Sequence, residues 1–255
     1  MSHAMKNIHA LPAALTAIAL ALAAGSAGAQ VVNGDSHAGL AGWQSAGDVA
    51  ANQGGSGRLV LTNASSIYQD DADANLPAGA RNVSGNDPLA TGLPGGLEDF
   101  VGVPLGAFDP DPANGVVAYE GSAASQTFVA AAGSQLSFQW DLGTLDQRND
   151  ATLADLAFVV IDGQVITLAN TLAATLPAAD GNATQTGWMD YTTTFASAGA
   201  HTISFGVVDI GDYDDSSTLS VAGVQVSSAV PEPTTLALMG AGLALLGLQR
   251  RRRDA

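Results

Sequence analysis

The sequence predicts an all-β protein, a single antiparallel β-sandwich of the jelly-roll type that carries one long loop insertion. Apolar and polar side chains alternate from residue 136 to 140 and again from 203 to 207, which is the period of a half-buried strand. Residues 31–228 are rich in Gly, Ala, Ser, Thr, Asp and Asn and show almost no helical periodicity. Short strands separated by turn residues favour a sandwich over a mixed α/β fold.

Further strands are expected at five short segments of β-type composition, namely 57–62, 123–130, 157–161, 164–168 and 190–195. Asp162-Gly163 lies between two of these runs and is typical of a two-residue hairpin turn. In the last strand Leu219 and Val221 have one parity, whereas Val224 and Val226 have the other. A β-bulge at Ala222-Gly223 is therefore expected to keep all four side chains in the core.

Residues 70–115 interrupt this pattern with many Asp, Asn, Pro and Gly residues and few β-branched ones. Irregular segments of this length are uncommon inside a compact domain and are often functional. We expect a surface insertion with a short helical turn near residues 97–101, within a domain that extends from residue 30 to 228.

The charge distribution excludes several classes of function. The 255 residues include 24 Asp and Glu but only 8 Lys and Arg, and the formal net charge is −16. Residues 30–230 hold three arginines and 22 acidic residues, so this part alone carries −19. A nucleic-acid site needs a basic face, which such a domain does not offer. Because the chain has no cysteine, disulfides, thiol nucleophiles and cysteine-ligated metals are also excluded.

Residues 1–29 read as an N-terminal signal peptide. Lys6 supplies a positive charge, an apolar stretch runs from residue 11 to 24, and Ala27 and Ala29 place small residues at the −3 and −1 positions. We expect signal peptidase to cleave before Gln30.

The C-terminal segment has three parts in a fixed order. Val230, Pro231, Glu232 and Pro233 come first, the apolar run 236–248 follows, and the last part is Arg250, Arg251, Arg252 and Arg253. The run is shorter than the roughly 20 residues of an ordinary transmembrane helix, but bilayer thinning and arginine snorkelling would let it span. The positive-inside rule places the arginines in the cytoplasm and the domain outside.

This tail, residues 230–255, closely resembles the PEP-CTERM sorting signal of Gram-negative bacteria, a segment also labelled as the C-terminal domain of ice-binding proteins. The resemblance implies a transient anchor in the inner membrane with the domain in the periplasm. It also implies cleavage near the motif by an exosortase-type protease and release to the cell surface or extracellular polymer.

Two other stretches resemble galactose-binding-like and carbohydrate-binding jelly rolls. Residues 32–35 (Val-Asn-Gly-Asp), followed by Gly42-Trp43, are similar to the opening strand of those modules. Residues 119–141 with 195–226 resemble the core of many proteins that carry the same sorting signal. The modules hold a structural calcium ion partly through positions at which this chain has Ser36-His37 and Ala222-Gly223 instead of the usual residues.

Closely spaced carboxylates are candidate calcium ligands, because calcium takes six to eight oxygen ligands. One set comprises Asp209, Asp212, Asp214 and Asp215, and the other comprises Asp109, Asp111 and Glu120. Neither set matches the full EF-hand pattern, and a solvated acidic loop is the alternative for both. No other cofactor is indicated.

Candidate catalytic groups are few. Glu98 and Glu120 are the only glutamates between residues 30 and 230, so a glycan hydrolase would use one of them with a second carboxylate across a cleft. His201 can be combined with serine and aspartate residues, but no Gly-x-Ser-x-Gly motif accompanies it. Two histidines and no cysteine in the exported part make a catalytic zinc site improbable. We therefore assign no catalytic residue.

Trp43 and Trp188 are candidate platforms for sugar rings, whose apolar faces pack on aromatic side chains. Each follows a glycine, so either could be partly exposed. Trp140, in contrast, alternates with Leu136 and Phe138 and is expected in the core.

Together these features predict an exported, non-enzymatic surface or matrix protein that associates with exopolysaccharide. One alternative is a purely structural or adhesive protein without a sugar site, which full burial of Trp43 and Trp188 would favour. The other is a secreted glycan hydrolase, which requires a cleft where Glu98 or Glu120 meets a second carboxylate.

Overall fold

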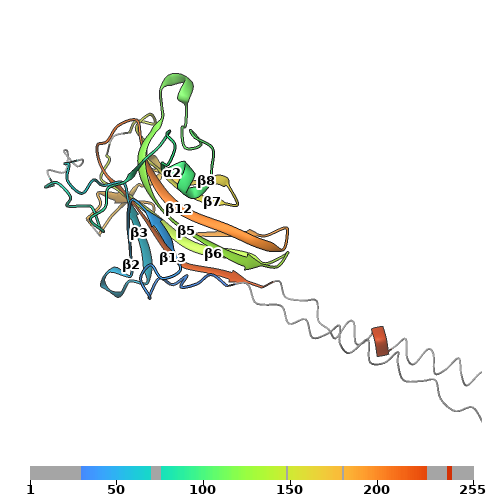
Figure 1. Ribbon diagram of the computed structural model, residues 1–255. Helices are drawn as coiled ribbons and strands as arrows, with labels where there is room; N and C mark the ends of the chain where they lie inside the picture. The colour runs from blue at the N-terminus through green and yellow to red at the C-terminus, as the bar shows by residue number, and fades with distance from the viewer. Residues whose placement is uncertain (1–29, 70–75, 148, 180, 229–239, 243–255) are drawn as a thin grey trace, which may run out of the picture.

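The computed structural model describes residues 30–69, 76–147, 149–179, 181–228 and 240–242. In it two antiparallel sheets pack face to face, which confirms the predicted β-sandwich (Figure 1). The strands are β1 (Gln44–Ala46), β2 (Asp48–Ala51), β3 (Arg58–Thr62), β4 (Leu89–Ala90), β5 (Ala118–Ala130), β6 (Gln135–Thr144), β7 (Leu156–Ile161), β8 (Gln164–Asn170), β9 (Leu176–Pro177), β10 (Thr184–Gln185), β11 (Met189–Thr194), β12 (Gly199–Ile210) and β13 (Ser217–Ser227). The helical segments are α2 (Leu97–Val101) and the 3₁₀ turns η1 (Gln53–Gly55), η2 (Pro112–Asn114) and η3 (Thr171–Ala173).

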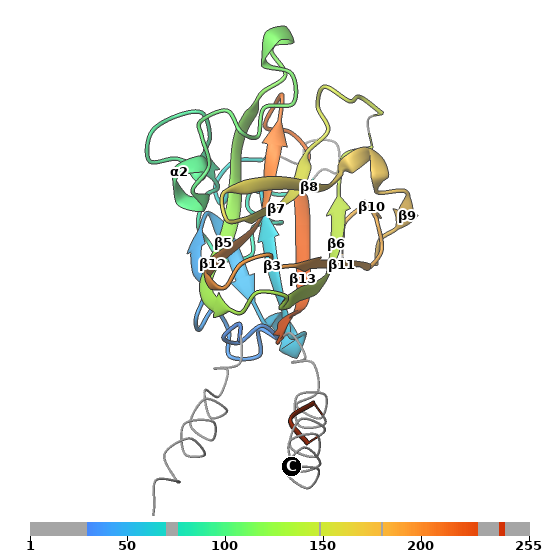
Figure 2. The ribbon, with the colours of Figure 1, turned by 90° about the vertical axis from the view of Figure 1, so that its right-hand side faces the viewer.

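The two sheets combine strands that are distant in sequence. The first has six strands in the order β1-β5-β12-β7-β8, and β4 also pairs with β5. The second has seven strands in the order β2-β3-β13-β6-β10-β9, and β11 also pairs with β6. The long strands β5, β12, β6 and β13 form the middle of the sandwich (Figure 2).

The alternating pattern places one set of side chains between the sheets. Phe138 of β6 and Phe205 of β12 meet edge to face with ring centroids 4.7 Å apart, and the other apolar residues of the same parity are buried with them. Trp140 belongs to this core, as predicted. Burial of these apolar side chains between the sheets stabilises the sandwich.

Two local predictions are confirmed. Asp162 and Gly163 form the turn between β7 and β8, and both have positive φ, as a type I′ hairpin requires. The register of β13 against β6 shifts between Ala222 and Gln225, which is the expected bulge. The apolar residues on both sides of the bulge are buried.

The second half of the predicted insertion packs on the outer face of the six-stranded sheet. Its helical turn is α2, and Leu97 and Val101 lie in a second hydrophobic cluster in which Phe108 meets Phe158 at 4.4 Å between ring centroids. A Cβ at Gly121 of β5 would lie 2.3 Å from the Val207 carbonyl oxygen and 3.0 Å from Leu97 Cδ2, so glycine at this position permits both the pairing with β12 and the approach of α2. This part of the insertion is therefore anchored by its own core.

The predicted signal peptide and the four C-terminal arginines lie outside the described residues, and of the predicted transmembrane helix only residues 240–242 are described. Among the residues that the structure does describe, no helix is both long and apolar enough to cross a membrane.

Candidate functional site

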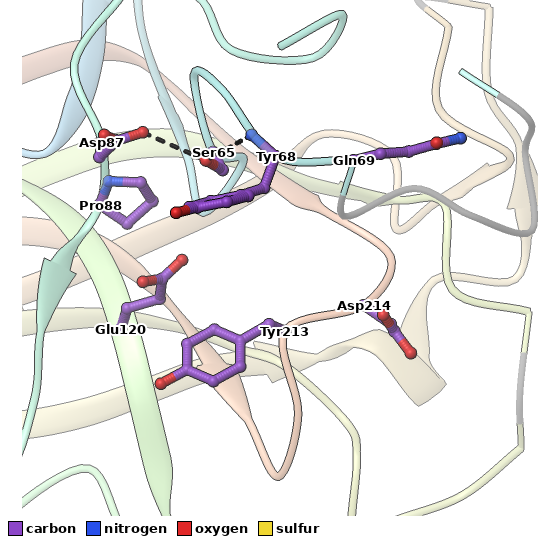
Figure 3. Close-up of a pocket in the computed structure, with 8 residues that line it drawn as sticks. All are labelled: Ser65, Tyr68, Gln69, Asp87, Pro88, Glu120, Tyr213 and Asp214. Carbon is purple, nitrogen blue, oxygen red and sulfur yellow. Dashed lines mark hydrogen bonds between the residues drawn. The ribbon is translucent and has the colours of Figure 1, made fainter. Parts of the chain in front are cut away.

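A cavity of about 460 Å³ opens at the end of the sandwich where β3 and β12 finish and β5 and β13 start. Four separate parts of the chain line it, with the residues Ser65, Tyr68, Gln69, Asp87, Pro88, Glu120, Tyr213 and Asp214. Figure 3 shows the rings of Tyr68 and Tyr213 on opposite sides of the open space, and the Glu120 carboxylate directed between them.

Hydrogen bonds fix the turn that carries Tyr68. Asp87 Oδ1 accepts from Ser65 Oγ (3.2 Å) and from the backbone N–H of Ser66 (2.7 Å). Ser65 Oγ in turn accepts from the backbone N–H groups of Ile67 (3.3 Å) and Tyr68 (3.2 Å). The bonds from Ser66 lower the pKa of Asp87, so its carboxylate is negatively charged at neutral pH. The Tyr68 side chain is left 71% exposed.

Tyr213 forms the opposite wall. Its ring stacks on Tyr119 with centroids 5.0 Å apart, yet the side chain is still 55% exposed. Partial burial, followed by the negative charges of Glu120 and Asp209, raises the pKa of the Tyr213 phenol. The phenol therefore keeps its proton at neutral pH and can donate a hydrogen bond into the cavity.

The cavity combines the two kinds of group that recognise sugars. The aromatic rings offer apolar faces for the C–H side of a sugar ring. Asp87, Glu120 and Asp214 offer carboxylate oxygens that accept hydrogen bonds from sugar hydroxyl groups. No basic side chain lies among the described residues that line this cavity.

The structure separates the predicted calcium ligands of the 209–215 segment. Asp214 lines the cavity, whereas Asp209 and Asp215 are buried at 3% and 2% exposure. Asp212 Oδ1 accepts a hydrogen bond from the Asp214 N–H (3.1 Å), as in an ordinary turn.

The second predicted set is also divided. Asp109 Oδ1 accepts from the Ala118 N–H (2.9 Å), Asp111 Oδ2 accepts from Asn114 Nδ2 (2.6 Å), and Glu120 lines the cavity. Within the described residues no group of three or more histidine or acidic side chains is arranged to hold a metal ion. Calcium binding stays a prediction from the sequence.

The two predicted tryptophan platforms differ. Trp43 is only 7% exposed, its indole N–H donates to the Asn33 carbonyl (3.2 Å), and its ring lies 5.9 Å from that of Phe205. The prediction that Trp43 is a sugar platform is therefore wrong, because this ring fills the core between the sheets. Trp188 is 45% exposed and remains accessible.

The other candidate catalytic groups have structural roles. Glu98 is fully buried, and its Oε1 accepts from the backbone N–H groups of Gly92 (2.9 Å) and Gly106 (3.2 Å). His201 Nδ1 lies 2.6 Å from Asp162 Oδ2, but its Nε2 faces the backbone carbonyl of Ser197 at 3.2 Å. A serine nucleophile would need that second nitrogen, so His201 does not form a catalytic triad.

Of the eight lining residues, sequence reasoning singled out Glu120 and Asp214 and missed the other six, which include Tyr68, Asp87 and Tyr213. One signal was available, since Tyr213 stands inside the acidic run 212–215. The acidic run predicts metal ligands, but the tyrosine ring within it suits stacking on a sugar as a tryptophan ring does.

Comparison with known proteins identifies the tail. Residues 229–253 match the family model described as the PEP-CTERM protein-sorting motif, which confirms the predicted sorting signal. The chain is thus an exported β-sandwich protein. Its motif indicates a C-terminal membrane anchor before processing by an exosortase-type protease. No curated protein matches the chain.

Two solved structures are similar to parts of the chain. The N-terminal cellulose-binding domain of β-1,4-glucanase C from Cellulomonas fimi is 14% identical, with a TM-score of 0.25 over 56% of this chain and 90% of that one. A family 35 carbohydrate-binding module from an environmental isolate is 19% identical, with a TM-score of 0.22 over 44% of this chain and 73% of that one. The fold described above rests on the strand pairing of this chain itself.

Proposed function

We propose that this protein binds an extracellular polysaccharide in the cavity between Tyr68 and Tyr213 and does not cleave it. The observation that carries the proposal is the pair of exposed rings on opposite walls of one cavity, with carboxylates between them. The volume of about 460 Å³ falls within the roughly 300–1,000 Å³ of small-ligand sites.

Each residue has a role in this proposal. Tyr68 and Tyr213 stack on the two faces of a sugar ring, and Glu120 accepts hydrogen bonds from its hydroxyl groups. Asp87 holds the turn of Tyr68 through Ser65 and Ser66. Trp188 supplies a separate aromatic contact for a longer chain. Calcium, if it binds the 209–215 carboxylates, would order the loop that carries Tyr213.

The sorting motif supports a proposal for where this binding takes place. After exosortase-type processing in a Gram-negative bacterium, the domain would leave the periplasmic side of the inner membrane for the cell surface or matrix. We propose exopolysaccharide as the polymer that the domain binds there, with a role in the biofilm.

A pull-down on native exopolysaccharide tests the proposal, with the full chain in detergent and with or without calcium. We expect retention of the wild type, and we expect Tyr213→Ala to be retained at least tenfold less. Val129→Ala, which alters another exposed apolar residue, should behave like the wild type. No retention of the wild type in either condition would contradict the proposal and would favour a purely structural or adhesive role.

One observation favours a second candidate, a glycan hydrolase. Glu120 shares its cavity with Asp87 and Asp214, which is the arrangement that this alternative requires. A hydrolase pairs a protonated acid with an ionised carboxylate, and Asp87 is held in the ionised form. Release of reducing ends by the wild type but not by Glu120→Gln would establish this enzyme, whereas a binding protein releases none.

A further inference from the structure

A second cavity, of about 340 Å³, gathers the basic side chains of the sandwich. Arg58 and Arg81 both line it, and they are the only lysine or arginine residues in the part of the chain that the structure describes. Among the residues that the structure describes, no acidic side chain lines this cavity, although residues 30–230 contain 22 of them. The cavity is therefore a cationic spot on a strongly anionic domain.

The cavity lies on the outer face of the seven-stranded sheet. Arg58 of β3 points away from the core, because its neighbour Leu59 is fully buried in it. Thr218 and Ser220 of the adjacent strand β13 line the same cavity. Their hydroxyl groups supply polar contacts beside the guanidinium.

The loop that precedes β4 is fixed over this face. Gln53 Nε2 donates to the Val83 carbonyl (3.1 Å). The buried carboxylate of Asp48 accepts from the N–H groups of Val83 and Ser84 and from the hydroxyls of Ser84 and Thr62. The carboxylate that anchors the loop is thus satisfied by backbone and hydroxyl donors and not by an arginine.

Arg81 is positioned by a neighbouring loop. Its Nη2 donates to Asn182 Oδ1 (2.7 Å). Asn182 packs so closely on β6 that a Cβ at Gly143 would lie 2.3 Å from Asn182 Nδ2. Arg81 therefore brings a second positive charge to the cavity from a fixed position.

In the part of the chain that the structure describes, the Nε of Arg58 has no acceptor. Its side chain is half-buried, and its Nε is buried without a hydrogen-bond partner. Within the described residues it forms no ion pair with a carboxylate. Burying part of a guanidinium without an acceptor costs free energy, and an external anion would supply the missing partner.

We propose that this cavity binds the carboxylate of an acidic sugar in a polysaccharide, with Arg58 as the main contact and Arg81 as the second charge. The planar guanidinium matches the two oxygens of a carboxylate, and Thr218 and Ser220 contact sugar hydroxyl groups. The inference rests on the proposed function and adds to it the class of polymer, one that contains uronic acids. No bridging cation is needed.

Isothermal titration calorimetry in EDTA tests the inference, with the full chain in detergent. The probes are trigalacturonate and its methyl ester, which has the same sugars without the charges. We expect the acid to bind at least tenfold more tightly than the ester. Arg58→Gln should weaken binding of the acid at least tenfold, and Arg58→Lys, which keeps the charge without the planar fork, should weaken it less. Tyr213→Ala, in the other cavity, should bind the trimer like the wild type.

Equal affinities for the acid and the ester would overturn the inference, and so would wild-type affinity in an Arg58→Gln protein that has an unchanged melting temperature. Inorganic phosphate that binds as tightly as the trimer would also overturn it, because the cavity would then serve a free anion. Failure of the proposed function gives a different result, namely no retention of native exopolysaccharide by the wild type.

Discussion

The carboxyl groups of Asp155 and Asp209 interact electrostatically in the interior, where neither side chain is more than 3% exposed. Asp155 also accepts from Asn63 Nδ2 (2.9 Å), Ser217 Oγ (2.6 Å) and the Ile210 N–H (3.1 Å). Burial raises the pKa of Asp155 to about 7. Burial and then the charge of Asp155 raise the pKa of Asp209 well above its ordinary value.

We expect the free energy of unfolding to increase as the pH falls from 8 to 5. In this range the pair takes up protons in the folded protein, whereas the same groups in the unfolded chain titrate near 3.8 and stay ionised. Stability therefore rises on acidification, which is opposite to the usual behaviour of paired carboxylates. Asp87, whose pKa is lowered, loses its contribution only below about 3.8, outside this range. Urea denaturation at four pH values measures the slope.

The variant Asp209→Asn should flatten this slope and raise stability at pH 8, because it removes one buried charge from the pair. Asp190→Asn, which alters an exposed carboxylate, should keep the wild-type slope. A wild type that loses stability between pH 8 and pH 5 would contradict the assignment.

We expect substitution of Trp43 to affect stability and substitution of Trp188 to affect polysaccharide binding. Trp43→Ala removes a core ring and should lower the free energy of unfolding by about 3–5 kcal/mol. Trp188→Ala should change it by less than about 0.5 kcal/mol and weaken retention on the polysaccharide. Chemical denaturation and the pull-down measure the two effects. Unchanged retention of Trp188→Ala would remove this residue from the site.

We expect Glu98 to contribute to the free energy of unfolding and not to ligand binding. Glu98→Ala leaves two backbone N–H groups without their acceptor and creates a small void, so we expect a loss of about 2–4 kcal/mol. Binding at 10 °C, where the variant remains folded, should equal that of the wild type. A specific loss of binding with normal stability would show that Glu98 reaches the ligand.

Glu232 should be required for sorting. Glu232→Ala changes the motif at residues 229–253, so we expect the protein to accumulate in the membrane fraction and not to be released. Gln225→Ala, an exposed change in β13, is the control and should be released normally. Cell fractionation followed by immunoblotting measures the distribution. Normal release of Glu232→Ala would contradict the role of the motif.

The sequence predicted the strands well because their signals are local. Alternation in β6 and β12, the Asp162-Gly163 turn and the change of parity at Ala222-Gly223 each depend on a few neighbouring residues, and each is confirmed. Trp43 was misjudged for the same reason. The adjacent Gly42 shows where the chain turns but not which way the next ring points.

The two cavities could not be predicted in this way. The tyrosine cavity joins residues 65, 87, 120 and 213, which only the pairing of the strands brings together. Arg58 and Arg81 stood out in the sequence as rare cations, but their meeting depends on the loop that Asp48 and Gln53 hold against β3. Such contacts arise from tertiary packing, and no periodic pattern in the sequence marks them.

Strand β13 separates the tyrosine cavity from the sorting motif along the length of the sandwich. This strand begins at Ser217, beside the tyrosine cavity, and ends at Ser227, just before the sorting motif (Figure 2). Eleven extended residues cover about 36 Å. A molecule held in the membrane by its tail would therefore present the tyrosine cavity at the end of the sandwich that is far from the point of attachment. Cleavage near the motif would release the domain and would leave the proposed sugar site unchanged.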